Sequence, residues 1–243
     1  MPSISYNIKI PTTWNQDTYT NFFSCFLKLG DTKYKEFNMK ITPTNYPMIG
    51  IRVPVIRKIA KDISKTNIYD FLEVSQFIYF EEILLRGVVI SYIDNYDIFI
   101  KYFNDYLKYI DNWAVCDLFV SSCKIIGNNK DKFIGIIDDL FKSQEEFKIR
   151  VAIVCLLNHF VDDKNYLDYF FQSIDKIDND SYYVNMAIAW FISVLFCKYR
   201  VRTLEYLKKN KLNDFTQNKA ISKIRESFRV STIDKKLVLK YKR

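Results

Sequence analysis

The chain has 243 residues, of which 49% are hydrophobic, and it carries a formal net charge of +8. Five glycines and five prolines are few for this length and leave little turn material for an all-β fold. No run of about 18 apolar residues is present, so a transmembrane helix is not expected. The positive charge suits a polyanionic partner, either nucleic acid or an anionic membrane, although a general basic bias is the simpler alternative.

The N-terminal stretch and the cysteines bear on the compartment. The stretch MPSISYNIKIPTTW has no charged region followed by an apolar one, so we expect no secretory signal. The cysteines are odd in number and never form a C-x-x-C pair. We therefore expect reduced thiols in a cytoplasmic protein, and neither a zinc site nor a disulfide framework.

The hydrophobic pattern has a helical period along nearly the whole chain. It predicts helices over residues 16–29, 54–65, 67–74, 78–94, 97–109, 112–126, 130–141, 144–160, 164–174, 181–198, 201–209, 214–228 and 232–241. Gly127 is expected to end the 112–126 helix, and Ser143 with Glu146 has the S-x-x-E pattern of a capping box. Only SYNIKI, residues 5–10, alternates as a strand would.

Short polar connections, such as GNNKD and DDKN, favour antiparallel helix pairs. The helices centred near residues 119, 152 and 190 are roughly 35–40 residues apart, close to the period of HEAT-like repeats. The expected fold is therefore all-α, a single-domain curved solenoid of HEAT-like antiparallel helix pairs over residues 1–243. Residues 1–45 would form a variable helical part and residues 231–243 a basic segment. An irregular helical bundle is the alternative, because the sequence repeat is weak.

Three predicted helices each bring unusual side chains. Trp113 and Asp117 lie four residues apart and so share one side of their helix. Arg150 interrupts an apolar row on the next long helix, and Trp190 lies on a third. In a repeat fold these four residues would lie on successive inner helices of one concave surface. In the simpler alternative, both tryptophans are core residues and Asp117 forms a salt bridge with Arg150.

Four motifs, in this order, carry a family resemblance: GIRVPVIRKIAKDI, NWAVCD, an arginine-centred helix and NMAIAWFISVLFCKY. Over roughly residues 46–230 the chain resembles the AlkD-like DNA alkylation repair family. The resemblance implies a curved solenoid and a glycosylase that releases cationic N3- or N7-alkylpurines. Matched by motif, it implies that Asp117 is catalytic and that Trp113, Trp190 and Arg150 bind the substrate. It also implies no metal or organic cofactor, and a lesion that stays stacked on an open face instead of entering a deep pocket.

These residue types suit the chemistry that the resemblance implies. Breaking the N-glycosidic bond builds positive charge on the deoxyribose, and a fixed carboxylate such as Asp117 stabilises that charge. Indole faces attract cationic bases and polarised sugar C–H groups, at about 0.5–2 kcal/mol each. An arginine holds a phosphate through its planar fork of donors.

One segment departs from the family pattern. In active members a full helix precedes the G-[IV]-x-x-P segment, whereas here Pro43 and Pro47 leave room for only two helical turns, about residues 32–39. The chain therefore resembles a branch with a shortened N-terminal recognition element. Whether it still seats a lesion stays open at this point.

The basic residues complete the expectations. Arg52, Lys58, Lys61, Arg225 and Arg229 are candidate contacts to the DNA backbone, although most lysines here suit solvated helix faces. We expect a monomer that binds double-stranded DNA and not a membrane. Two alternatives remain: a non-enzymatic binder of damaged or branched DNA, and a protein-interaction solenoid that holds an acidic peptide. The only histidine, His159, is expected to be a cap or packed residue, so a hydrolytic triad is not expected.

Overall fold

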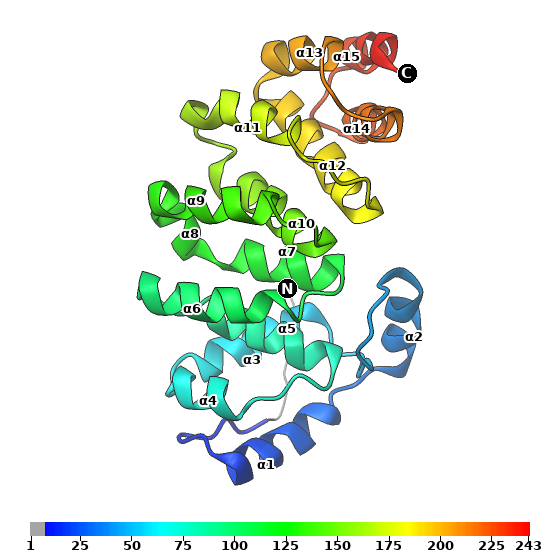
Figure 1. Cartoon of the computed structure of the whole chain (residues 1–243). Coiled ribbons are helices and arrows are strands. Elements are labelled where there is room, and N and C mark those ends of the chain that lie inside the picture. Colours follow the sequence, from blue (N-terminus) through cyan, green and yellow to red (C-terminus); the bar gives the residue numbers. More distant parts are fainter. Residues whose placement is uncertain (1–7) are drawn as a thin grey trace. The chain divides into compact units, whose positions relative to one another are not determined.

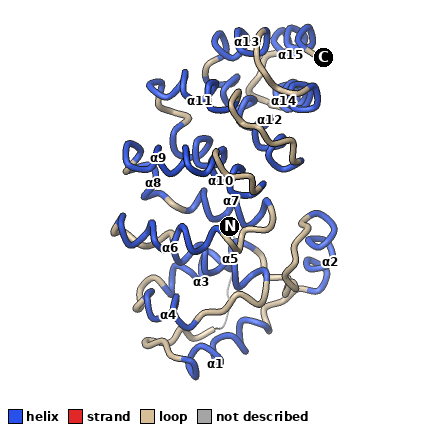
Figure 2. The backbone as a smooth tube through the Cα atoms, in the orientation of Figure 1, coloured by secondary structure: helices blue, strands red, loops and turns tan. Residues whose placement is uncertain are grey.

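The computed structural model describes residues 8–243, and these form helices and loops with no strand (Figure 2). The all-α fold class predicted from the helical period is thereby confirmed. The chain divides into two compact units, Met1–Ile125 and Ile126–Arg243. The strand pattern at SYNIKI lies partly outside the described residues, and residues 8–10 form no strand. No helix in the described part of the chain is both long and apolar enough to cross a bilayer.

In the first unit, α5 is the central helix (Figure 1). It packs against α3 and α7 and also contacts α4 and α6. Nearly every residue of α5 is buried, including two glutamates at its start, as expected of a helix that others enclose. The helices of this unit are α1 (Gln16–Leu27), α2 (Thr32–Ile41), α3 (Val53–Ile63), α4 (Ile68–Val74), α5 (Phe80–Ile90), α6 (Tyr96–Leu107) and α7 (Trp113–Ser122), and the short α8 (Lys124–Asn128) spans the boundary.

In the second unit, α12 is the central helix and packs against α10, α13 and α14. Most residues along its length are buried. The elements of this unit are α9 (Lys130–Phe141), α10 (Glu146–Cys155), a π-helical turn η1 (Leu156–Phe160), a 3-10 turn η2 (Lys164–Tyr166), α11 (Leu167–Ile174), α12 (Tyr182–Lys198), α13 (Arg200–Lys208), α14 (Asp214–Glu226), α15 (Thr232–Leu237) and a 3-10 turn η3 (Val238–Tyr241).

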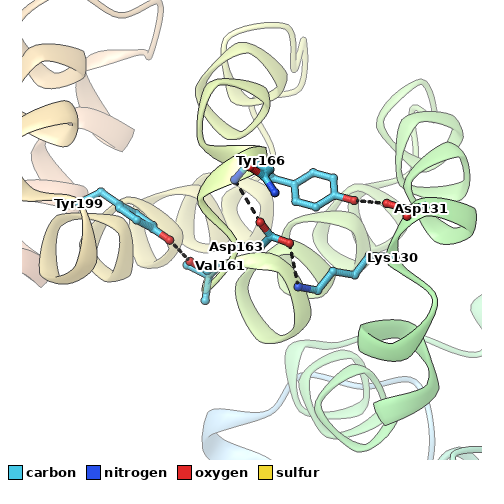
Figure 3. A network of polar contacts seen from close by, with 7 residues as sticks. Lys130, Asp131, Val161, Asp163, Tyr166 and Tyr199 are labelled. Atoms are coloured by element: carbon cyan, nitrogen blue, oxygen red, sulfur yellow. Dashed lines mark hydrogen bonds and ion pairs between the residues drawn. The ribbon is translucent and has the colours of Figure 1, made fainter.

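Several polar contacts in the second unit join residues that are 33 to 38 positions apart in the sequence. Tyr166 donates to Asp131, 35 residues away, at 2.8 Å, and the Tyr199 hydroxyl donates to the Val161 carbonyl, 38 residues away, at 2.9 Å (Figure 3). The same network holds an ion pair between Lys130 and Asp163, 33 residues apart. The first two separations fall within the period of roughly 35–40 residues that the sequence predicts for a two-helix repeat, and the third is slightly shorter.

The predicted helix over residues 112–126 is interrupted at Cys123. The helix α7 ends at Ser122, Cys123 has a non-helical ψ of 69°, and α8 begins at Lys124. The hydroxyls of Ser121 and Ser122 both donate to the Leu118 carbonyl, at 3.2 and 2.7 Å, where they compete with the helical amide donor. Gly127 therefore lies inside α8 and does not end the longer helix.

The predicted capping box at Ser143 and Glu146 is also wrong. The residue that caps α10 is Glu145, and the Ser143 hydroxyl accepts a hydrogen bond from the Glu145 amide at 3.1 Å. The Glu146 carboxylate instead accepts from the Tyr183 amide at 2.7 Å, 37 residues away. A contact with the next long helix thus replaces the local one.

Candidate functional site

The start of α7 presents Trp113 and Asp117 in the first unit. The buried Asn112 caps this helix, since its side-chain oxygen accepts from the amides of Ala114 and Val115 at 2.9 and 3.0 Å. Trp113 and Asp117 follow on one side of the helix, and both side chains are half-buried. The indole and the carboxylate are therefore held on a fixed helix end and remain partly accessible.

Hydrogen bonds tie the start of α7 to the segment that follows α2. The Trp113 indole N–H donates to the carbonyl of Ile41, the last residue of α2, at 3.1 Å. The Asp111 carboxylate accepts from the Thr44 hydroxyl at 2.8 Å and from the Asn45 amide at 2.7 Å. The shortened N-terminal element is thus attached directly to Trp113.

The helix α2 is short, and its apolar side chains are exposed. It spans Thr32–Ile41 and ends before Pro43, close to the two turns predicted from the prolines. Within the first unit it lies to one side of α3 and α5 (Figure 1). Phe37 and Ile41 are 57% and 47% exposed and lie four residues apart on one side of the helix. An apolar, accessible surface therefore adjoins the Trp113 contact.

Arg52, a predicted phosphate contact, is engaged on the surface. Its guanidinium donates to the Asp31 carboxylate at 3.0 Å and lies 4.4 Å from the centre of the Tyr34 ring. Asp31 caps α2, and its pKa is lowered first by the Tyr34 amide and then by the hydrogen bond from Arg52. In this conformation Arg52 fixes the start of α2.

The G-I-R segment is shaped by a glutamate that the sequence analysis missed. The buried Glu81 carboxylate accepts from the amides of Ile49, Gly50 and Ile51, at 2.7, 2.7 and 3.2 Å. Gly50 has a φ of +99°, and a Cβ there would lie 2.5 Å from the Asp31 carbonyl oxygen. The signal for this role is the acidic pair Glu81–Glu82 at the start of an otherwise apolar helix.

Lys58 and Lys61 are exposed on α3 and line a cleft with residues of α5 and α7. In the second unit, Arg225 lies in the last turn of α14 and Arg229 in the following loop, and both are exposed. Between them, Phe228 is fully exposed. These four basic residues are therefore accessible to an anionic partner.

Arg150 and Trp190 belong to two helices of the second unit that pack together, α10 and α12. Arg150 is only 6% exposed, and its guanidinium donates to the Tyr183 carbonyl at 2.9 Å. Because Glu146 accepts from the amide of the same tyrosine, α10 fixes the start of α12 at both backbone groups. Trp190 lies further along α12 and is half-buried.

The remaining candidates concern metals and the histidine. No group of three His, Cys, Asp or Glu side chains in residues 8–243 is arranged to hold a metal ion. His159 lies half-buried in the π-helical turn that follows α10. Within the first unit the structure brings Trp113 against the end of α2, and Asp117 follows one turn later on α7. Within the second unit it brings Arg150 against the helix that carries Trp190.

Comparison with known proteins identifies the family to which the chain belongs. No curated protein matches the chain. The profile of the family described as "DNA alkylation repair enzyme" matches residues 25–224, well over half of the chain. The matched range includes α2, the Gly50 turn and the helices that carry Trp113, Asp117, Arg150 and Trp190. The chain therefore belongs to the family of DNA alkylation repair enzymes.

Proposed function

We propose that this member of the DNA alkylation repair family is a DNA glycosylase that releases cationic N3- or N7-alkylpurines from double-stranded DNA. The observation that carries the proposal is the pairing of Trp113 and Asp117, half-buried on one side of α7, within a chain that matches the family. An indole and a carboxylate in that relation suit a sugar that becomes positively charged. The accessible Lys58, Lys61, Arg225 and Arg229 supply cations for the DNA backbone.

The proposed reaction is hydrolysis at C1′ of the damaged nucleotide. The C1′–N bond breaks and its electron pair stays with the alkylated base, which becomes neutral and leaves. Asp117 stabilises the positive charge that develops on the sugar. A water molecule then adds to C1′ and gives up one proton, which leaves an abasic site in the strand.

The other residues have positioning roles in this proposal. The face of Trp113 supports the sugar, and its bond to Ile41 fixes the plane of the indole. Trp190, half-buried on α12, offers a second aromatic surface to the DNA. Arg150, which holds the Tyr183 carbonyl, orients the helix that carries Trp190.

Single-turnover release of 7-methylguanine from a methylated duplex, with protein in excess, tests the proposal. Replacing Asp117 by Asn should slow release by about 10²-fold or more, since one preorganised electrostatic partner is worth about 2.7–4 kcal/mol. DNA affinity should not fall, because the carboxylate repels phosphate. Release by the wild type at the spontaneous rate would remove the enzyme proposal.

One observation favours a second candidate function, that of a non-enzymatic DNA-binding protein. The helix α2 has only ten residues, and Phe37, Met39 and Ile41 expose apolar surface where the family has a full recognition helix. The same release assay separates the two candidates, since a non-enzymatic binder keeps duplex affinity without releasing base. If the protein instead binds another protein, no DNA binding that weakens with rising salt is expected.

A further inference from the structure

A cleft of about 480 Å³ lies in the first unit between α3, the end of α5 and the end of α7. Four cationic side chains line it: Arg57, Lys58 and Lys61 from α3, and Lys124 just after α7. Hydroxyl groups of Ser121 and Ser122 lie on the opposite wall, and none of the lining residues is acidic. The cleft is therefore lined by cations and by no carboxylate, a lining that suits a phosphate.

Arg57 is held across this cleft. Its Nη1 donates to the Ser122 hydroxyl at 3.1 Å, and that hydroxyl donates in turn to the Leu118 carbonyl at 2.7 Å. A guanidinium has five N–H donors, and this bond uses one of them. The Arg57 fork is thus oriented by α7 while most of its donors can serve a ligand.

The cations exceed what the local helix ends require. The helices α5 and α7 end at the cleft, at Ile90 and Ser122, and a helix C-terminus carries a charge of about −0.5. Two such ends offset only about one positive charge, which is less than the combined charge of Arg57, Lys61 and Lys124. The surplus favours an anion from outside the protein.

The cleft lies on the side of α7 that carries Asp117. Ser121 follows Asp117 by four residues, which is about 6 Å along the helix axis. Successive phosphates of one DNA strand advance about 3.4 Å along the duplex axis. With the duplex axis parallel to α7, the cleft would therefore hold a phosphate about two nucleotides from the sugar at Asp117.

We propose that this cleft binds one backbone phosphate of the damaged strand, about two nucleotides from the lesion, and so sets the register of the strand on α7. The distance from the lesion rests on the proposed function, because it is counted from Asp117. The family resemblance gives a DNA contact to Arg150, whose side chain is 6% exposed and bound to the Tyr183 carbonyl. The cleft supplies an accessible phosphate contact in the other unit.

The first test compares two charge-matched double variants. Arg57→Gln with Lys124→Gln removes two cleft cations, whereas Lys101→Gln with Lys108→Gln removes two exposed cations, one within α6 and one just after it. Duplex affinity is measured between about 50 and 200 mM salt. Log K falls as log salt rises, and for the cleft variant this fall should be less steep by roughly one, the value for one phosphate contact. Equal slopes for the two variants would overturn the proposal.

The second test maps the register with uncharged methylphosphonate linkages placed singly along a duplex that contains one 7-methylguanine. Wild-type affinity should fall at one linkage, about two nucleotides from the lesion, and the cleft variant should lose that dependence. A flat map, or a sensitive linkage elsewhere, overturns the register.

Both tests read binding, so they separate the cleft from the glycosylase proposal. A sensitive linkage without base release leaves the cleft standing and removes the enzyme. Base release with a flat map removes the cleft proposal and leaves the enzyme proposal standing.

Discussion

Trp113 donates its indole N–H to the Ile41 carbonyl at 3.1 Å, and this bond joins the start of α7 to the last residue of α2. Ile41 is the last residue of α2, which has only ten residues. The position of the aromatic face and the shape of the shortened element are therefore coupled. A substitution at Trp113 should therefore alter the end of α2, and a change in α2 should alter the position of the indole.

Replacing Trp113 by Phe tests this coupling. The variant keeps an aromatic face but loses the donor, so the Ile41 carbonyl loses a bond worth about 1 kcal/mol. Amide hydrogen exchange in residues 42–47 should become faster, and base release should slow by roughly fivefold, the equivalent of that energy. Trp190→Phe is the control, because it should leave exchange at residues 42–47 unchanged. Unchanged exchange in Trp113→Phe would show that the bond does not hold the segment.

Two glycines should respond to alanine in opposite directions. Gly50→Ala places a Cβ against the Asp31 carbonyl at a φ of +99°, so we expect the free energy of unfolding to fall by about 1–3 kcal/mol. Gly135→Ala, in the exposed interior of α9, meets nothing within 4 Å and should raise it by about 0.5–1 kcal/mol. Urea unfolding of both variants measures the difference. Similar effects at the two positions would contradict the strained turn at Gly50.

The sequence predicts the helices well because a buried helix face leaves a periodic pattern. Local competition leaves no such pattern, which is why the break at Cys123 was missed: it depends on the hydroxyls of Ser121 and Ser122 reaching the Leu118 carbonyl. Contacts distant in sequence are missed for the same reason. The bond from Trp113 to Ile41 and the cleft between Arg57 and Ser122 each join residues more than sixty positions apart.

Glu81 shows what a buried carboxylate contributes here. Glu81→Gln replaces one acceptor oxygen by an NH₂ group that faces the amides of residues 49–51. The free energy of unfolding should fall by roughly 2–4 kcal/mol, because charge-assisted bonds are lost and a buried donor stays unpaired. Glu73→Gln, on the exposed side of α4, is the matched control and should change it by less than about 0.5 kcal/mol. Equal unfolding midpoints for the two variants would show that Glu81 does not hold the turn.

Tyr166 gives the second unit a contribution to stability that is lost at alkaline pH. Burial, followed by its hydrogen bond to Asp131, raises the pKa of Tyr166 from 10.0 to about 12 (Figure 3). A raised pKa means that the folded chain keeps the proton after the unfolded chain has released it. The contribution of Tyr166 is therefore complete below about pH 10 and is lost as the pH rises from about 10 to 12.

Urea unfolding of the wild type and Tyr166→Phe between pH 8 and 11 measures this loss. At pH 8 the wild type should be more stable by about 1 kcal/mol, the net value of one hydrogen bond. Above pH 10 the difference should shrink, because only the wild type has this proton to lose on unfolding. Asp131→Asn keeps an acceptor but removes the negative charge, so its loss of stability above pH 10 should be weaker than that of the wild type. A difference between wild type and Tyr166→Phe that stays constant up to pH 11 would mean that Asp131 does not hold the Tyr166 proton in the folded chain.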